Sequence, residues 1–247
     1  MADNDDNRPR RLVEFKDGCR YGKFGKTKAH ELIAQQRIRA FKMGGKRYCR
    51  GCRFSTILAD PPWQFQNKTG KIAPEHRRLS RYGTMSLDEI KALPVADIAA
   101  EPSHLYLWVP NALLAEGLQV MEAWGFNYKS NIVWRKIRKD GGSDGRGVGF
   151  YFRNITELVL FGVKGKNART LKPARTQTNF IESRKREHSR KPDELYPIIE
   201  KCSPGPFLEL FARGRRQGWK AWGNEANSSY HPNWSTYKYH SSAEAAE

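Results

Sequence analysis

The sequence predicts an α/β fold in which a mostly parallel sheet carries helices on both faces. Short runs rich in β-branched and aromatic residues alternate with segments that have helix caps and helical apolar spacing. With 247 residues, the chain is long enough to bury one core of this kind. Ligands of such sheets collect at the carboxyl ends of the strands, so residues at those ends are the first candidates for a functional site.

Six segments indicate strands because they are short, apolar and rich in Val, Ile, Phe, Tyr and Trp. Turn residues or polar loops separate them. The predicted strands cover residues 54–59, 104–109, 131–136, 156–165, 207–212 and 219–223.

Two of the helices between these strands have start signals. Ser86, with Glu89 three residues later, forms a capping box for a short helix. Pro192 suits the first turn of another helix, in which Pro197 is expected to cause a bend or an interruption.

A third helix is predicted between the second and third strands. Asn111 is its expected cap, and Gly125 is expected to end it. The spacing of its apolar residues places three of them on one face: Leu114, Leu118 and Met121.

The termini differ in composition from the middle. Residues 1–50 form a basic N-terminal arm, residues 51–230 the predicted globular domain and residues 231–247 a C-terminal tail. Within the arm, residues 28–43 could form one amphipathic helix with an apolar face of Leu32, Ile33, Ile38 and Phe41. A solvated leader and a phosphate-binding arm are equally open alternatives.

The charge balance indicates a polyanionic partner. The formal net charge is +18, and three irregular basic segments, 64–81, 137–149 and 165–190, interrupt the domain. Nucleic acid is the first candidate and an anionic membrane surface the second. No apolar run reaches membrane-spanning length, and the amphipathic segment around residue 35 is too short and polar to bind a membrane surface, so no membrane partner is expected. Four cysteines and a polar N-terminus favour a reducing, cytoplasmic location.

The stretch "ILADPPW" carries the candidate chemistry. Asp60 ends a predicted strand, and Pro61 and Pro62 fix the backbone without offering an N–H group. The stretch therefore presents acceptors and no donor, which suits the exocyclic amine of a nucleobase, and Trp63 could stack on the base. Acceptors that grip both N–H bonds would free the nitrogen lone pair for attack on a methyl sulfonium. On this motif alone, a polyproline turn is an equal alternative.

A metal site is a weaker alternative. Cys49 and Cys52 form one C-x-x-C pair, which with Cys19 and His30 could bind zinc. These four residues are scattered, so we predict no metal. A redox pair is disfavoured because no thioredoxin-like pattern surrounds the cysteines.

Seven motifs in order resemble the DPPW-type adenine-N6 methyltransferase family, which includes the catalytic subunit of the eukaryotic mRNA adenosine methyltransferase. The resemblance covers residues 54–225. Its motifs are "ILADPPW", "YGTMSLDEI", "LYLWV", "NIVWRK", "ELVLFGVKG", "SRKPDELY" and "LELFARGRRQGWKAWGNE". It implies a Rossmann-like S-adenosylmethionine-dependent methyltransferase fold with the β-type motif order.

The resemblance also implies roles for single residues. Asp60, Pro61, Pro62 and Trp63 would hold the target amine. The residues implied at the adenine are Tyr82, Glu157 and Lys191. The residues implied at S-adenosylmethionine are Asp60, Lys191, Arg213, Arg215, Asn224 and Glu225. Without the resemblance, Lys191 would be a solvated residue before a helix, and Arg213 a partner of Glu209 or Glu225.

Three departures bear on the substrate and the donor. Gly214, Arg215 and Arg216 stand where eukaryotic members often have Pro-His-Asn, and Glu225 stands where Gln is common. The loop 64–81 is longer than in the mRNA enzymes and resembles bacterial and phage members, which are expected to act on DNA. We therefore expect adenine-N6 methylation of DNA. RNA as the substrate, a non-catalytic nucleic-acid-binding subunit and a homodimer stay open.

Overall fold

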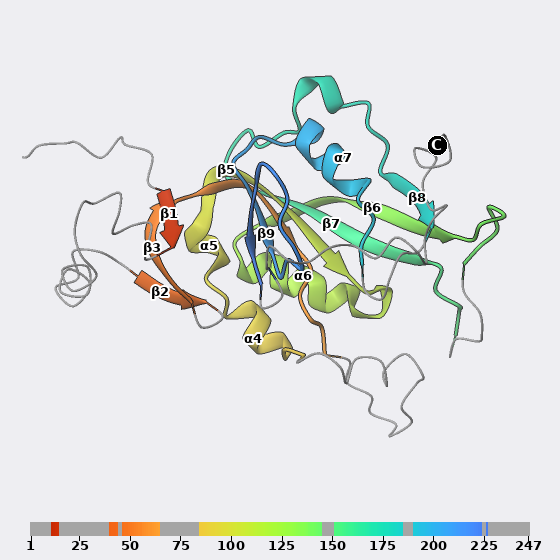
Figure 1. Cartoon of the computed structure of the whole chain (residues 1–247), viewed down its shortest axis with the longest axis horizontal. Coiled ribbons are helices and arrows are strands. Elements are labelled where there is room, and N and C mark those ends of the chain that lie inside the picture. The colour runs from red at the N-terminus through yellow and green to blue at the C-terminus, as the bar shows by residue number, and fades with distance from the viewer. Residues whose placement is uncertain are drawn as a thin grey trace, which may run out of the picture.

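A computed structural model describes residues 11–14, 40–43, 46–64, 84–144, 151–184, 190–223 and 226. Its main body is a seven-stranded sheet with the strand order β10-β9-β4-β5-β7-β6-β8 (Figure 1). The strands are β4 Phe54–Ala59, β5 Ala99–Val109, β6 Asn127–Ile137, β7 Thr156–Lys164, β8 Phe180–Arg184, β9 Phe207–Leu210 and β10 Trp219–Trp222. All six predicted strands are confirmed. β8 lies in a segment that was expected to be irregular.

The prediction of a mostly parallel sheet is also confirmed. The β10–β9, β9–β4, β4–β5 and β6–β8 pairs are parallel, whereas β7 is antiparallel to both β5 and β6. β7 therefore runs against all the other strands of this sheet. Its first residues consequently lie at the edge where the parallel strands β4 and β5 end.

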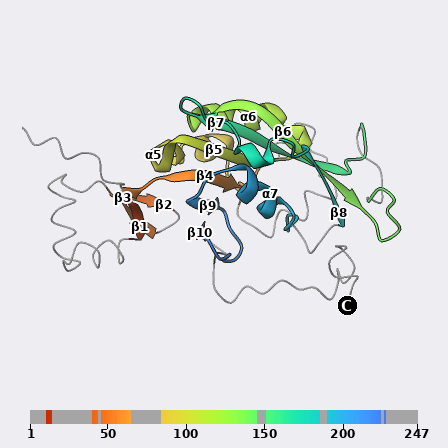
Figure 2. The ribbon, with the colours of Figure 1, turned by 90° about the horizontal axis from the view of Figure 1, so that it is seen from above.

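Helices cover both faces of the sheet, as predicted (Figure 2). The helical elements are α4 Leu87–Lys91, α5 Val95–Ile98, η1 Asn111–Leu113, α6 Leu114–Ala123, η2 Lys172–Ala174 and α7 Leu195–Cys202. Residues of α4, α5 and α6 pack in one apolar cluster with β4 and β5, and residues of α7 pack in a second cluster with β6 and β10. The described part of the chain contains no helix that is long and apolar enough to cross a membrane.

The start of α4 and the end of α6 follow the sequence prediction. The Ser86 hydroxyl accepts from the Glu89 amide, and the Glu89 carboxylate accepts from the Ser86 amide at 2.8 Å. Gly125 has a φ of 79°, the left-handed conformation that ends α6.

The predicted cap of α6 was wrong, and of the three apolar residues predicted on one face only Met121 is buried. Asn111 lies in η1 and donates to Asn154 and Thr156 instead of capping a helix. Leu114 and Leu118 are 41% and 37% exposed, because Gly117 sets the contact face. A Cβ at Gly117 would lie 2.6 Å from a methyl group of Val109 on β5, so only glycine permits this approach. The buried residues of α6 are Gly117, Val120 and Met121.

The interruption expected in the last helix was also wrong. α7 begins at Leu195, so Pro192 precedes the helix and Pro197 is its third residue. Amide groups of the first turn have no partner within a helix, so Pro197 removes no hydrogen bond.

The N-terminal segment contains a small antiparallel sheet with the order β1-β3-β2, from Arg11–Glu14, Lys46–Cys52 and Ala40–Met43. The predicted helix over residues 28–43 is therefore wrong at its end, because residues 40–43 pair with β3. Leu32, Ile33 and Ile38 lie outside the described residues.

The face of α6 can be tested with a matched pair of variants. We expect Met121→Ala to lower the free energy of unfolding by about 2–5 kcal/mol, because it opens a cavity in the core. Leu118→Ala, on the exposed side of the same helix, should change it by less than about 1 kcal/mol. Denaturant unfolding of both variants measures these values. Equal losses would contradict the observed orientation of α6.

Candidate functional site

The site is built around the residues that leave β4. Asp60 follows the last residue of β4, and its backbone N–H donates to the Leu210 carbonyl of β9 at 3.4 Å. The Pro61 carbonyl accepts from the Trp63 amide at 2.8 Å, and the Pro62 carbonyl accepts from the Met85 amide at 2.9 Å. Each carbonyl keeps a second lone pair. The backbone is thus fixed in its turn while its acceptor capacity is only partly used.

Trp63 does not offer the stacking surface that the sequence suggested. Its side chain is only 6% exposed, and its indole N–H donates to the Trp108 carbonyl of β5 at 2.9 Å. A buried indole with its N–H satisfied locks the turn onto the neighbouring strand. The structure therefore gives Trp63 a positioning role.

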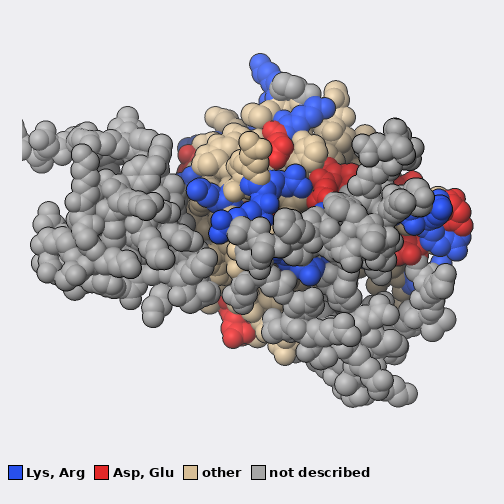
Figure 3. All heavy atoms as spheres, in the orientation of Figure 1, with Lys and Arg blue, Asp and Glu red and all other residues tan. Residues whose placement is uncertain are grey.

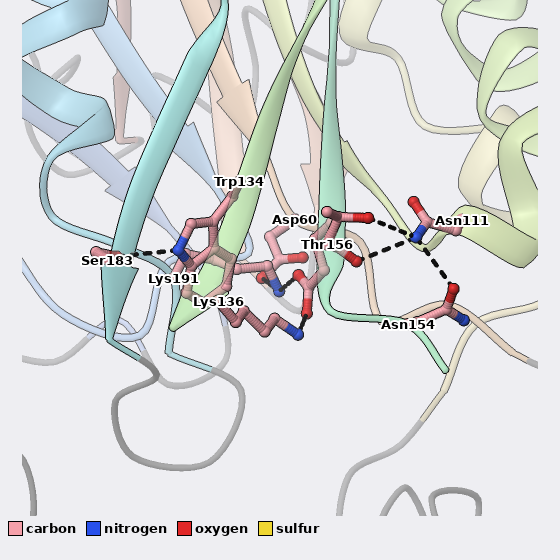
Figure 4. A network of polar contacts seen from close by, with 9 residues as sticks. Asp60, Asn111, Trp134, Lys136, Asn154, Thr156, Ser183 and Lys191 are labelled. Carbon is pink, nitrogen blue, oxygen red and sulfur yellow. Dashed lines mark hydrogen bonds and ion pairs between the residues drawn. The ribbon is translucent and has the colours of Figure 1, made fainter. Parts of the chain in front are cut away.

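An alternating chain of charges lies at this edge of the sheet (Figure 4). The Lys191 ammonium lies 3.0 Å from the Asp60 carboxylate and 3.5 Å from the Glu157 carboxylate. Lys136 of β6 forms an ion pair with the same Glu157, which is the second residue of β7. Because β7 runs antiparallel, residues 97 positions apart in sequence, Asp60 and Glu157, share one lysine.

The protonation states follow from burial and these charges. Burial raises the pKa of the Asp60 carboxyl, and Lys191 offsets part of that rise. Burial also acts to raise the pKa of Glu157, but Lys191 and Lys136 together outweigh it and hold that pKa below its usual value. Burial disfavours the Lys191 ammonium, yet Asp60 and Glu157 raise the pKa of Lys191. Lys191 is therefore a permanent cation between two carboxylates.

Aromatic rings complete the surroundings of both lysines. The Lys191 ammonium lies 5.3 Å from the Trp108 ring centre, and the Lys136 ammonium lies 5.1 Å from that of Trp134. The Trp134 N–H is held by the Ser183 hydroxyl at 2.9 Å. These contacts limit the positions that each ammonium can take.

A second polar cluster, which the sequence did not reveal, lies beside the first. Glu209 of β9 is in register with Leu58 of β4, and its carboxylate accepts from the Tyr196 hydroxyl at 2.8 Å. Burial raises the pKa of Glu209 to about 7. The Arg216 guanidinium lies 3.8 Å from the Tyr196 ring centre. One sequence signal could have indicated this cluster, because Glu209 is an acid inside an apolar strand. Its partners come from distant segments, so the sequence does not identify them.

The structure brings together only some of the predicted site residues. Asp60, Glu157 and Lys191 are in contact, and Arg213 is close enough for its charge to lower the pKa of Asp60. Arg215 is exposed beyond Arg213. Tyr82, Asn224 and Glu225 lie outside the described residues, so their predicted roles stay predictions.

The groups at the ends of β4 and β9 fit S-adenosylmethionine. Asp60 and Glu209 supply carboxylates that suit hydroxyl or ammonium groups, and Arg213 supplies a cation that suits a carboxylate. The chain turns sharply there: Phe211 has a φ of 63°, and a Cβ at Gly223 would lie 2.5 Å from the Ala212 carbonyl. Such close backbone turns after parallel strands are common at ligand sites of α/β sheets.

No cluster of three or more metal-binding side chains occurs among the residues that the structure describes. Cys49 and Cys52 lie on β3, while Cys19 and His30 fall outside the described ranges.

Comparison with known proteins confirms the resemblance. The MT-A70 family matches residues 54–225. A probable N(6)-adenosine-methyltransferase MT-A70-like protein of Oryza sativa subsp. japonica is 34% identical over 71% of this chain and 23% of its own length. Type II methyltransferase M.MunI of a Mycoplasma species is 31% identical over 70% of this chain and 78% of its own. The human N(6)-adenosine-methyltransferase catalytic subunit METTL3 is 30% identical over 70% of this chain and 28% of its own length.

The chain therefore belongs to the MT-A70 family, and methyltransferases of this family use S-adenosylmethionine. It spans about a quarter of the length of its plant relatives, which are longer proteins.

The raised pKa of Glu209 predicts a pH effect on stability. The pKa rises from 4.5 to about 7 on folding, so the stability that the protonated carboxyl contributes at low pH is lost as the pH rises through about 7. Glu209→Gln keeps an acceptor for Tyr196 and removes this loss. Its free energy of unfolding, relative to wild type, should rise by at most about 3 kcal/mol between about pH 5 and about pH 8.

Denaturant unfolding at both pH values measures this difference. Glu122→Gln, which removes an exposed carboxylate of α6, is the control. If the difference in free energy of unfolding between Glu209→Gln and wild type is the same at both pH values, the raised pKa of Glu209 is contradicted.

Proposed function

We propose that this chain transfers the methyl group of S-adenosylmethionine to the N6 amine of adenine in DNA. The observation that carries the proposal is the position of the Asp60 carboxylate at the end of β4. Two rigid prolines follow Asp60 in the chain, and the Lys191 ammonium pairs with its carboxylate. A carboxylate and two partly used carbonyl oxygens together form an acceptor set for a planar amine.

The acceptor set addresses the main difficulty of the reaction. The lone pair of an adenine amine is delocalised into the ring, so the amine is a poor nucleophile. Asp60 and the Pro61 or Pro62 carbonyl would accept its two N–H groups and turn the lone pair out of the ring plane. These hydrogen bonds strengthen as positive charge develops on nitrogen, so they stabilise the transition state more than the ground state. S-Adenosylmethionine, when bound, would supply a methyl group on a cationic sulfur that leaves as a neutral thioether, and the methylated amine would then release one proton to Asp60 or to water.

Lys191 and Glu157 act on the orientation of Asp60. Lys191 neutralises the charge of Asp60, and Glu157 holds Lys191 from the other side. Asp60 can then accept an N–H of the amine with its remaining lone pairs. The other proposed contacts follow the family motifs: Tyr82, Glu157 and Lys191 at the adenine, and Asp60, Lys191, Arg213, Arg215, Asn224 and Glu225 at the donor.

DNA is favoured over RNA by the pattern of coverage. The similarity to M.MunI extends over most of that protein, whereas it covers about a quarter of the adenosine methyltransferases. The long loop 64–81 also resembles bacterial and phage members of the family, which are expected to act on DNA. The target adenine would leave the duplex at a cost of about a few kcal/mol. Figure 3 shows Lys and Arg side chains over the middle of one face, and the exposed Arg215 and Lys220 suit phosphate contacts.

The test is methyl transfer from labelled S-adenosylmethionine to four polymers: double- and single-stranded DNA and RNA. We expect N6-methyldeoxyadenosine after digestion, and Asp60→Asn should lower the rate by about 100-fold or more because it weakens the main acceptor. Glu122→Gln, an exposed acid of α6, should leave the rate unchanged.

Methylation of RNA alone would contradict DNA as the substrate. Binding of nucleic acid with no transfer to any polymer would favour a non-catalytic subunit instead. An Asp60→Asn variant as fast as wild type would contradict the role of Asp60.

A further inference from the structure

Two adjacent aromatic side chains are almost fully exposed. Tyr151 and Phe152 are 94% and 88% exposed, whereas Tyr128, another exposed ring of this chain, is 44% exposed. Exposing two large rings side by side forgoes apolar burial of roughly 1.5–3 kcal/mol for the phenylalanine alone. A pair that the fold leaves in solvent is therefore a candidate contact surface.

The aromatic pair lies on the approach to the candidate site. Phe152 precedes Glu157 by five residues, which limits the separation of their Cα atoms to at most about 18 Å. β7 begins at Thr156, at the edge where β4 and β5 end, and Val109 at the end of β5 pairs with Leu158. The segment that carries the pair thus enters the sheet at the same edge as Asp60.

Hydrogen bonds anchor this segment to the site. The Asn111 amide donates to the Asn154 side chain at 3.3 Å and to the Thr156 carbonyl at 3.1 Å. Asn111 follows the end of β5, and Thr156 directly precedes Glu157 (Figure 4). Phe152 is only two residues from the anchored Asn154. The rings are therefore tied to the rim of the site.

The neighbouring charge also suits a nucleic acid. Arg153 directly follows the two rings and is itself exposed. An exposed cation next to exposed rings matches the alternation of phosphate and base along a strand. The occupant that fits both features is a polynucleotide strand.

We propose that Tyr151 and Phe152 form a stacking platform for the bases that flank the target adenine, with Arg153 on a neighbouring phosphate. This inference rests on the proposed function, because that function places the target base at Asp60. Bases that stack on the two rings would hold the strand in position while the target base enters the site. Stacking does not depend on base identity, so the platform gives affinity without setting the recognition sequence.

The test is equilibrium binding of the full chain to two labelled single-stranded DNA oligonucleotides of equal length, one with bases and one with abasic sugars. Tyr151→Ala and Phe152→Ala should each weaken binding to the base-bearing strand by about 10-fold and leave binding to the abasic strand unchanged. Tyr151→Trp, which keeps a stacking ring, should keep the base-dependent affinity of the wild type.

Two controls separate stacking from other effects. Arg153→Ala should weaken binding to both oligonucleotides equally, because both carry phosphates. Tyr128→Ala, at the start of β6 and the opposite edge of the sheet, should change neither.

Equal losses on both oligonucleotides in the ring variants, or no loss on either, would overturn the platform. A second result would also overturn the platform. If the ring variants change their mass in solution but keep base-dependent affinity, the rings contact a second protein chain and not a nucleic acid. The binding test needs no methyl transfer, so failure of the proposed function shows separately, as wild-type protein that binds but does not methylate.

Discussion

The ion pair between Asp60 and Lys191 is the constraint on which the candidate site depends. Burial at the end of β4 disfavours a charged carboxylate, and the ammonium 3.0 Å away offsets part of that penalty. Lys191 in turn stays charged because Glu157 flanks it on the other side. Without the shared cation, the partly buried Asp60 would lose its ion-pair partner, whereas Glu157 would keep Lys136.

The reversed strand β7 makes this arrangement possible. In a fully parallel sheet the start of each strand lies far from the edge where ligands bind. Because β7 runs the other way, its start delivers Glu157 to the end of β4, and the segment before it brings two exposed aromatic rings to the same rim. The reversed strand thus brings the proposed amine-binding residues and the proposed stacking platform to one edge of the sheet.

The sequence predicted those parts of the fold that depend on local signals. Strands β4, β5, β6, β7, β9 and β10, the Ser86 capping box and the Gly125 terminus are local patterns, and each was confirmed. The errors arose where tertiary packing decides. The inward face of α6 is set by the fit of Gly117 against Val109, which apolar spacing alone does not show. Trp63 looked like a stacking residue because its burial against β5 is invisible in the sequence.

The same division holds within the site. The family motifs identified Asp60, Glu157 and Lys191, and the structure shows them in contact. Lys136 and the Glu209–Tyr196 hydrogen bond were missed, because their partners come from strands distant in sequence. Side-chain contacts between such strands follow from the sheet register, and single-sequence patterns do not fix that register.

The most direct test of the central ion pair is a carbon NMR titration of the Asp60 side-chain carboxyl in wild type and in Lys191→Met. The variant removes the cation and keeps a side chain of similar length. If Lys191 stabilises the charged carboxylate, the apparent pKa of Asp60 rises in the variant, because burial then acts without an opposing charge. An Asp60 pKa that is the same in both proteins would contradict the ion pair as the organising interaction of the site.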